Sequence, residues 1–214
     1  MTDFQIEKND YQGKGYVIYR QLINEAFADV FTCYLGLKRK VREELIKDKV
    51  ISETNNTLFG FIGDDLVENC YSLYGDVLFD TVMIKLQSTV EDFHKQKLYP
   101  TYSYARMYDK NHKMEKHTDR DECEVSVTMN LGGDLWPIFI KDFKGEERKV
   151  ELNPGDALIY QGSKCEHWRE PFEGKHCFQL FLHYVTDKYK HLLFDERPFL
   201  GIPYSIGKKE DNES

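Results

Sequence analysis

The sequence predicts an α+β protein in which helices precede a β core. Up to about residue 99, apolar residues recur at steps of three and four, which is the spacing of one face of a helix. After Pro100 the period changes to two, as in a half-buried strand. Clusters of Gly, Pro, Asn and Asp then separate several short segments, which is typical of a sandwich or barrel. We therefore expect helices packed on a β core.

Two helical segments are expected in the first half of the chain. Residues 21–47 form an amphipathic pattern that Gly36 interrupts, so one kinked helix and two separate helices both fit it. Residues 52–57 read as a loop. Residues 65–97 carry the second helical pattern, whose apolar positions are Leu66, Cys70, Leu73, Leu78, Val82, Leu86, Val90 and Phe93.

The β core is expected at about residues 100–186. The side chains that share one face of its first strand are Tyr102, Tyr104, Arg106 and Tyr108. Further strands are predicted at residues 124–131, 136–140, 148–152, 156–160 and 176–185. Turn-forming residues at 132–134 and 153–156 separate some of them. Residues 187–214 form a tail, and we expect its polar end, 208–214, to be disordered.

Length and composition limit the function classes. The chain has 214 residues, enough for one core, so we expect a single domain over 1–214: helical support at about 1–99, the β core at about 100–186, and a tail at 187–214. The net charge of −8 does not favour binding to nucleic acid. No apolar run is long enough for a membrane and no secretory signal is visible, so a cytoplasmic location is expected. Five cysteines without a C-x-x-C pair argue against disulfides and structural zinc.

A candidate metal site combines His117, Asp119 and His167. His117 and Asp119 are two residues apart, so on a strand their side chains point to the same face. His167 follows 48 residues after Asp119 and supplies a second imidazole. Two histidines and one carboxylate form a facial triad, which leaves three adjacent positions of an octahedral iron(II) open. Zinc is the weaker candidate, because a zinc hydrolase would need a general base that the sequence does not single out.

Five motifs occur in an order that resembles a known family. They are YARMY (104–108), HTDR (117–120), NPGDA (153–157), HWREP (167–171) and QLFLHY (179–184). The chain resembles the 2-oxoglutarate- and iron(II)-dependent oxygenases, prolyl 4-hydroxylase-like branch, over about residues 102–185. The resemblance implies a double-stranded β-helix (jelly-roll) core supported by N-terminal helices. It also implies Fe(II), 2-oxoglutarate and O2 as cofactor and cosubstrates. Asp119 as a ligand favours hydroxylation over halogenation, which needs that position for halide.

The resemblance also implies residues that anchor 2-oxoglutarate. In the family, a basic residue nine or ten positions after the distal histidine usually pairs with the distal carboxylate. Lys175 lies eight positions after His167 and His176 lies nine. We prefer Lys175, because an ammonium group is charged at neutral pH. Tyr108 is the expected hydroxyl donor to the same carboxylate, with Tyr104 in reserve, and packing of the β core is the alternative role for both.

The sequence leaves the substrate class open. The family resemblance implies hydroxylation of a C–H bond, including that of a peptidyl proline. The alternatives are a small-molecule hydroxylase of the phytanoyl-hydroxylase type and a β-helix protein that binds metal or ligand without turnover. The loops that set the substrate vary within the fold, so the sequence does not separate a peptide or protein from a small molecule. Trp168 and Arg169 are candidates for the substrate channel or for packing beside the metal. The oligomeric state is not indicated.

Overall fold

The computed structural model describes residues 6–7, 10–53 and 58–203. The predicted loop at 52–57 lies partly outside these residues and the predicted disordered end at 208–214 lies wholly outside them. No helix in the described ranges is both long enough and apolar enough to cross a membrane. The elements, in chain order, are β1 (Ile6–Glu7), α1 (Tyr11–Lys14), β2 (Tyr16–Tyr19), α2 (Glu25–Lys47), β3 (Phe61–Ile62), β4 (Tyr71–Tyr74), α3 (Val77–His94), β5 (Tyr99–Asp109), β6 (Met114–His117), η1 (Asp121–Cys123), β7 (Val125–Gly133), β8 (Ile138–Lys141), β9 (Glu147–Val150), β10 (Ala157–Tyr160), β11 (His167–Arg169), β12 (His176–Val185) and η2 (Asp187–Glu196).

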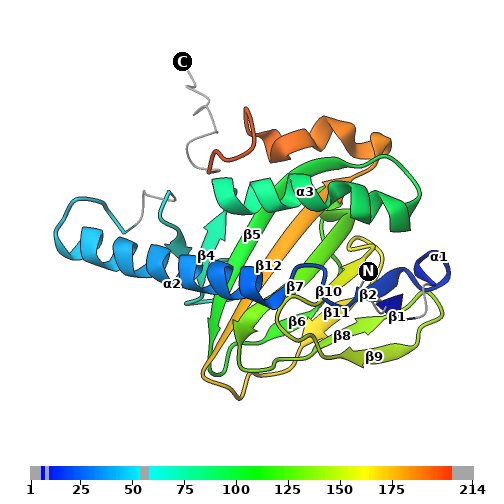
Figure 1. The fold of residues 1–214 in the computed structure, drawn as a ribbon, viewed down its shortest axis with the longest axis horizontal. Coiled ribbons are helices and arrows are strands. Elements are labelled where there is room, and N and C mark those ends of the chain that lie inside the picture. The colour runs from blue at the N-terminus through cyan, green and yellow to red at the C-terminus, as the bar shows by residue number, and fades with distance from the viewer. Residues whose placement is uncertain (1–5, 8–9, 54–57, 204–214) are drawn as a thin grey trace.

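Two antiparallel sheets form the β core (Figure 1). The larger sheet has the strand order β1-β2-β10-β7-β12-β5-β4-β3, and the smaller one has the order β6-β11-β8-β9. From β5 to β12, consecutive strands mostly alternate between the two sheets, which is the winding of a double-stranded β-helix. The predicted α+β class, with a jelly-roll core and N-terminal helices, is confirmed.

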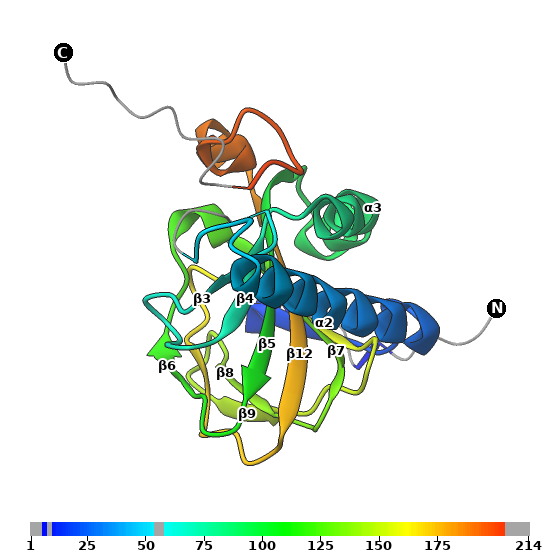
Figure 2. The ribbon, with the colours of Figure 1, turned by 90° about the vertical axis from the view of Figure 1, so that its left-hand side faces the viewer.

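The two long helices cover one face of the larger sheet, and Figure 2 shows them beside β5, β12 and β7. Helix α2 is one continuous helix of 23 residues, so the open question at Gly36 is settled. The Asn24 side chain caps it by accepting a hydrogen bond from the backbone of Phe27. Ala28, Phe31 and Leu35 are the buried apolar residues of α2. This stripe at helical spacing turns α2 toward the sheet.

The predicted helix at 65–97 is wrong in its first part. Only α3, at Val77–His94, is helical, whereas Tyr71–Tyr74 is the strand β4, which pairs with β5. All four residues of β4 are buried, and periodicity cannot distinguish such a short apolar run from a helix segment. Gly75 separates the two elements with a positive φ of 62°, and a Cβ there would collide with the guanidinium of Arg197.

The two faces of the larger sheet have different chemistry. Ala105, Leu180 and Met129 belong to the apolar cluster of the face under the helices. The opposite face carries polar and aromatic side chains from alternate positions, and these include Tyr104, Arg106, Tyr108, Ser126, Thr128, Asn130, Gln179 and His183. A fold that needed only a stable core would leave this inner face apolar. Its polar residues therefore indicate a binding site between the sheets.

Candidate metal centre

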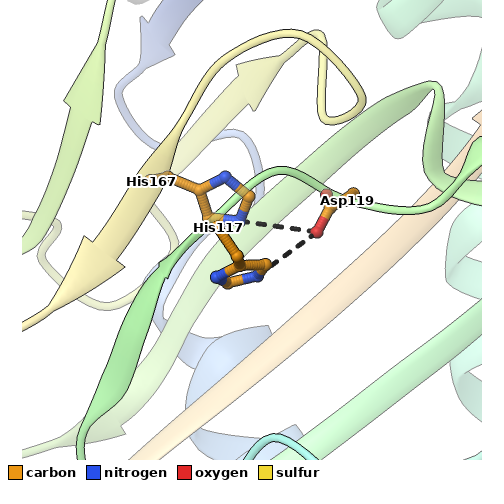
Figure 3. A group of neighbouring side chains, drawn as sticks. All are labelled: His117, Asp119 and His167. Carbon is orange, nitrogen blue, oxygen red and sulfur yellow. Dashed lines mark ion pairs between the residues drawn. The ribbon is translucent and has the colours of Figure 1, made fainter.

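The three predicted ligands lie side by side (Figure 3). His117 ends β6, Asp119 follows two residues later, and His167 begins β11. The strands β6 and β11 pair so that His117 and His167 lie directly opposite each other, with ring centroids 4.4 Å apart. The backbone N–H of Asp119 donates to the carbonyl of Gly162 at 2.9 Å, which fixes the chain where it leaves β6.

The imidazoles are oriented so that each presents the same nitrogen. His117 Nδ1 lies 2.8 Å from the carbonyl oxygen of Glu115, and His167 Nδ1 lies 3.0 Å from that of Cys165. A carbonyl accepts only from N–H, so Nδ1 carries the hydrogen in both rings and Nε2 keeps its lone pair. These Nε2 atoms lie 3.6 Å and 3.5 Å from Asp119 Oδ1. The ligand atoms lie within 4.8 Å of one another, an arrangement that fits a single divalent metal ion.

Asp119 is held as a carboxylate. Its burial raises the pKa, but the favourable interactions of the carboxylate with the imidazoles of His117, His167 and His183 outweigh burial and lower the pKa to about 2. Ser126 Oγ donates to Asp119 Oδ2 at 3.0 Å and lies 3.0 Å from Nδ1 of His183. Burial lowers the pKa of His183 to about 4, so this histidine is neutral at neutral pH. Ser126 thus holds one carboxylate oxygen, and the other oxygen faces the imidazoles.

A second set of neighbouring groups, Asp119, Cys123 and His183, shares the same carboxylate. Burial raises the pKa of the Cys123 thiol well above its ordinary value, and this thiol lies 3.0 Å from the hydroxyl of Tyr102. A metal needs the thiolate, which these surroundings disfavour. The set of two imidazoles and one carboxylate is therefore the better metal site.

A cleft of about 830 Å³ opens onto the triad. Arg106 lines it and pairs with Asp64, whose carboxylate also accepts a hydrogen bond from Tyr104. Asp195 lines it as well, paired with Arg120 at 3.0 Å and hydrogen-bonded to the hydroxyl of Tyr74. The lining residues are Phe61, Asp64, Asp65, Leu66, Tyr74, Tyr102, Tyr104, Arg106, Met114, His117, Thr118, Asp119, Arg120, Cys123, Tyr160, His167, Phe181, His183 and Asp195.

The structure does not bring the predicted anchors Lys175 and His176 to the triad. Lys175 is exposed, and its backbone N–H donates to Asp134. His176 Nδ1 lies 2.6 Å from Asp109 Oδ1, and 38% of the His176 side chain is exposed. Neither residue lines the cleft. On β12 the side chains alternate, and it is Cys177 that turns toward the inner face.

Both predicted tyrosines lie on the inner face. Tyr104 lines the cleft, and its hydroxyl donates to Asp64 at 2.5 Å. Tyr108 is completely buried, and its oxygen accepts a hydrogen bond from Arg106 Nη1 at 3.2 Å. The period-two pattern of residues 102–108 had indicated this shared face.

Sequence reasoning did not assign a role to Ser126 or His183, or single out Arg169 as a charge inside the core. Arg169 is only 2% exposed and stands two residues after His167 on β11, so both side chains point to one face. The alternation of His167, Trp168 and Arg169 was the available signal. Trp168 points the other way and stacks on Phe139 with ring centroids 5.4 Å apart. Neither Trp168 nor Arg169 lines the cleft.

Comparison with known proteins supports the fold. No family model and no curated protein matches the chain. Among solved structures, a Pseudomonas putida prolyl-4-hydroxylase superposes with a TM-score of 0.60 at 14% identity, covering 83% of this chain and 95% of that one. HygX from Streptomyces hygroscopicus, with nickel and 2-oxoglutarate bound, gives 0.55 at 12% identity, with coverages of 83% and 85%. A viral collagen prolyl hydroxylase from Paramecium Bursaria Chlorella virus-1 gives 0.56 at 11% identity, with coverages of 83% and 98%. The chain thus has the fold of the 2-oxoglutarate/iron(II) oxygenases, with a His-Asp-His candidate for their metal site.

Proposed function

We propose that this protein is a 2-oxoglutarate- and iron(II)-dependent dioxygenase that hydroxylates a C–H bond. The observation that carries the proposal is the facial triad of His117, Asp119 and His167 in the lining of an open cleft. Two neutral imidazoles and one carboxylate are the donor set of non-haem iron(II) oxygenases. The iron, with 2-oxoglutarate and O2 bound, would supply the oxidant that attacks an unactivated C–H bond.

The residues of this chain hold and shield that metal. His117 and His167 present Nε2, because backbone carbonyls fix their Nδ1–H groups. Ser126 keeps one oxygen of Asp119 occupied, so that the other oxygen is left for the metal. The aromatic walls of the cleft, among them Tyr160 beside His167, limit the access of water to the oxidant.

For the substrate, we propose a peptidyl proline. Six phenylalanine and tyrosine rings line the cleft, those of Phe61, Tyr74, Tyr102, Tyr104, Tyr160 and Phe181, and proline-rich segments dock in grooves with aromatic walls. The alternative is a small molecule, which the cleft volume of about 830 Å³ also accommodates. A panel of proline-rich peptides and small molecules, scored by succinate release, distinguishes the two. Stimulation by small molecules alone would contradict the peptide substrate.

The proposal is tested by the anaerobic visible spectrum of the apoprotein, to which iron(II) and then 2-oxoglutarate are added. A metal-to-ligand charge-transfer band is expected only when both are present. It should be lost in His167→Ala and kept in His191→Ala, which removes an exposed histidine from η2. Absence of the band in the wild type, with metal binding intact, would contradict the use of 2-oxoglutarate and favour a zinc site or a protein without turnover.

A further inference from the structure

Arg169 is a cation buried inside the β core without a counterion. Its Nη1 donates to the carbonyl of Trp136, its Nη2 donates to Gln179 Oε1 at 3.2 Å, and its Nε is buried with no hydrogen-bond partner among the described residues. In the part of the chain that the structure describes, no carboxylate forms an ion pair with it. The ionisable groups around the guanidinium are the thiol of Cys177 and the phenols of Tyr108 and Tyr160. Burial of an unpaired charge is strongly unfavourable, so a bound anion would relieve a large penalty.

This cation lies close to the metal ligands. Arg169 follows His167 by two residues on one strand face, which places their Cα atoms about 6.6 Å apart. The facing sheet repeats this order: Ser126, which holds Asp119, is followed on the same face by Thr128 and Asn130. Asn130 Oδ1 accepts from Gln179, the side chain that also accepts from Arg169. The Arg169 guanidinium thus bonds to Gln179, which lies four residues from His183, the neighbour of Ser126, on the same face of β12. A five-carbon diacid bound to the metal at one end can bridge this span.

Two more polar groups are available around the same position. Thr128 Oγ1 is buried and has no hydrogen-bond partner within the described ranges. Thr128 lies two residues nearer to Ser126 on β7 than Asn130 does. Tyr108 accepts a hydrogen bond from Arg106, which leaves its own hydroxyl hydrogen for another acceptor. Tyr108 and Arg169 contact the same indole: the Tyr108 ring lies 4.8 Å from that of Trp136, and Arg169 Cζ lies 5.0 Å from it. Thr128 and Tyr108 therefore offer donor groups on the inner face of the sheet that Arg169 faces.

Three other basic side chains that could bind an anion are either paired with a carboxylate or exposed. Arg106 lies on the same inner face but forms an ion pair with Asp64. His176 is paired with Asp109. Lys175 is exposed at the surface. Of these four, only Arg169 is a buried cation without a carboxylate.

We infer that Arg169, together with Tyr108 and Thr128, binds the distal carboxylate of the dicarboxylate cosubstrate, in place of Lys175 or His176. The inference rests on the proposed function, because it takes the triad as the anchor of the other end of that molecule. The guanidinium donates Nε–H, which has no acceptor among the residues that the structure describes, and the carboxylate neutralises its charge.

Equilibrium binding of two 2-oxo acids to the iron(II)-loaded protein without oxygen tests this role. 2-Oxoglutarate and 2-oxopentanoate share the metal-chelating end, and only the first has a distal carboxylate. In Arg169→Met the affinity for 2-oxoglutarate should fall at least about thirty-fold, while that for 2-oxopentanoate stays near the wild-type value. The matched control Lys175→Met should bind both as the wild type does.

Folding of the variant is checked by its thermal midpoint without ligand. Arg169→Met should melt no lower than the wild type, because it removes an unpaired buried charge. If Arg169→Met does not fold, Arg169→Lys tests the anchor instead. Arg169→Lys should prefer 2-oxoglutarate over 2-oxopentanoate less strongly than the wild type does, because an ammonium group cannot reproduce the planar, two-pronged donor geometry of a guanidinium. An undiminished preference in either Arg169 variant, or its loss in Lys175→Met, would overturn the anchor and leave the proposed function intact. A wild type that binds neither 2-oxo acid would overturn both.

Discussion

At the scale of single residues, the charge of Asp119 decides whether the site can hold a metal. It is the one anionic member of the triad, and both imidazole Nε2 atoms face its Oδ1. Asp119→Ala should abolish iron-dependent succinate formation, which can be measured directly in turnover assays. The exposed carboxylate of Asp121 provides the control, since Asp121→Ala should retain activity. Undiminished turnover in Asp119→Ala would exclude the triad.

His183 should make the free energy of unfolding depend on pH, even without substrate. Burial lowers its pKa from 6.5 to about 4, so between these values the unfolded chain binds a proton that the folded chain does not. The free energy of unfolding should therefore decrease as the pH falls from 6.5 to 4, by up to about 3 kcal/mol. Urea denaturation of the apoprotein at pH 7 and pH 5 measures this loss. His183→Gln should show a flatter dependence, and an equal slope in both proteins would contradict the assignment.

At the scale of elements, the sequence predicts those helices and strands whose apolar residues follow a clear helical or alternating pattern. The strands β7 and β12 lie where alternating apolar residues indicate them, and α2 follows its stripe from Glu25 to Lys47. The strand β4 was predicted as helix, because Tyr71–Tyr74 is buried on both faces and carries no alternation. β2 was missed for the same reason, with three of its four residues buried where it pairs with β10.

The candidate site likewise contains residues that a local sequence pattern predicts and contacts that it does not predict. His117, Asp119 and His167 were predictable because strand alternation relates the first two and motif order supplies the third. The positions of the Lys175 and His176 side chains were not predictable, since counting from His167 along the chain cannot show which way a residue of β12 points. The pairing of Cys177 with Tyr108 shows that direction, since it turns His176 away from the inner face. Whether an arginine is paired likewise depends on contacts between strands distant in sequence.

The cap of α3 also connects the two helices that support the core. Asp76 accepts from the backbone of Leu78 at 3.0 Å, accepts from the hydroxyl of Tyr34 at 2.9 Å, and forms an ion pair with Lys38 at 3.0 Å. Asp76→Ala should therefore cost about 2 kcal/mol in the free energy of unfolding, the upper end for a lost cap. Asn24→Ala, which removes only the cap of α2, should cost about 1 kcal/mol. Urea denaturation compares the two, and equal losses would mean that the contacts to α2 contribute nothing.

At the scale of the whole molecule, the triad joins the two sheets. His117 and His167 belong to the smaller sheet, whereas Ser126 on β7 holds Asp119 against the larger one. A metal bound by all three should therefore stabilise the closed core and not merely one loop. Because the assembled site exists only in the folded state, iron(II) at 100 times its dissociation constant should add about 2.7 kcal/mol to the free energy of unfolding. Anaerobic thermal melts with iron(II), and again with a chelator in excess, measure this effect.

Two variants separate this effect from non-specific metal binding. His167→Ala should melt at the same temperature with and without iron(II), because two remaining ligands bind the ion only weakly. His191→Ala should respond as the wild type does, since this exposed histidine lies outside the site. Equal stabilisation of His167→Ala would show that the metal binds elsewhere. The triad would then be a cluster of packed polar residues, and the oxygenase fold would here serve a protein without turnover.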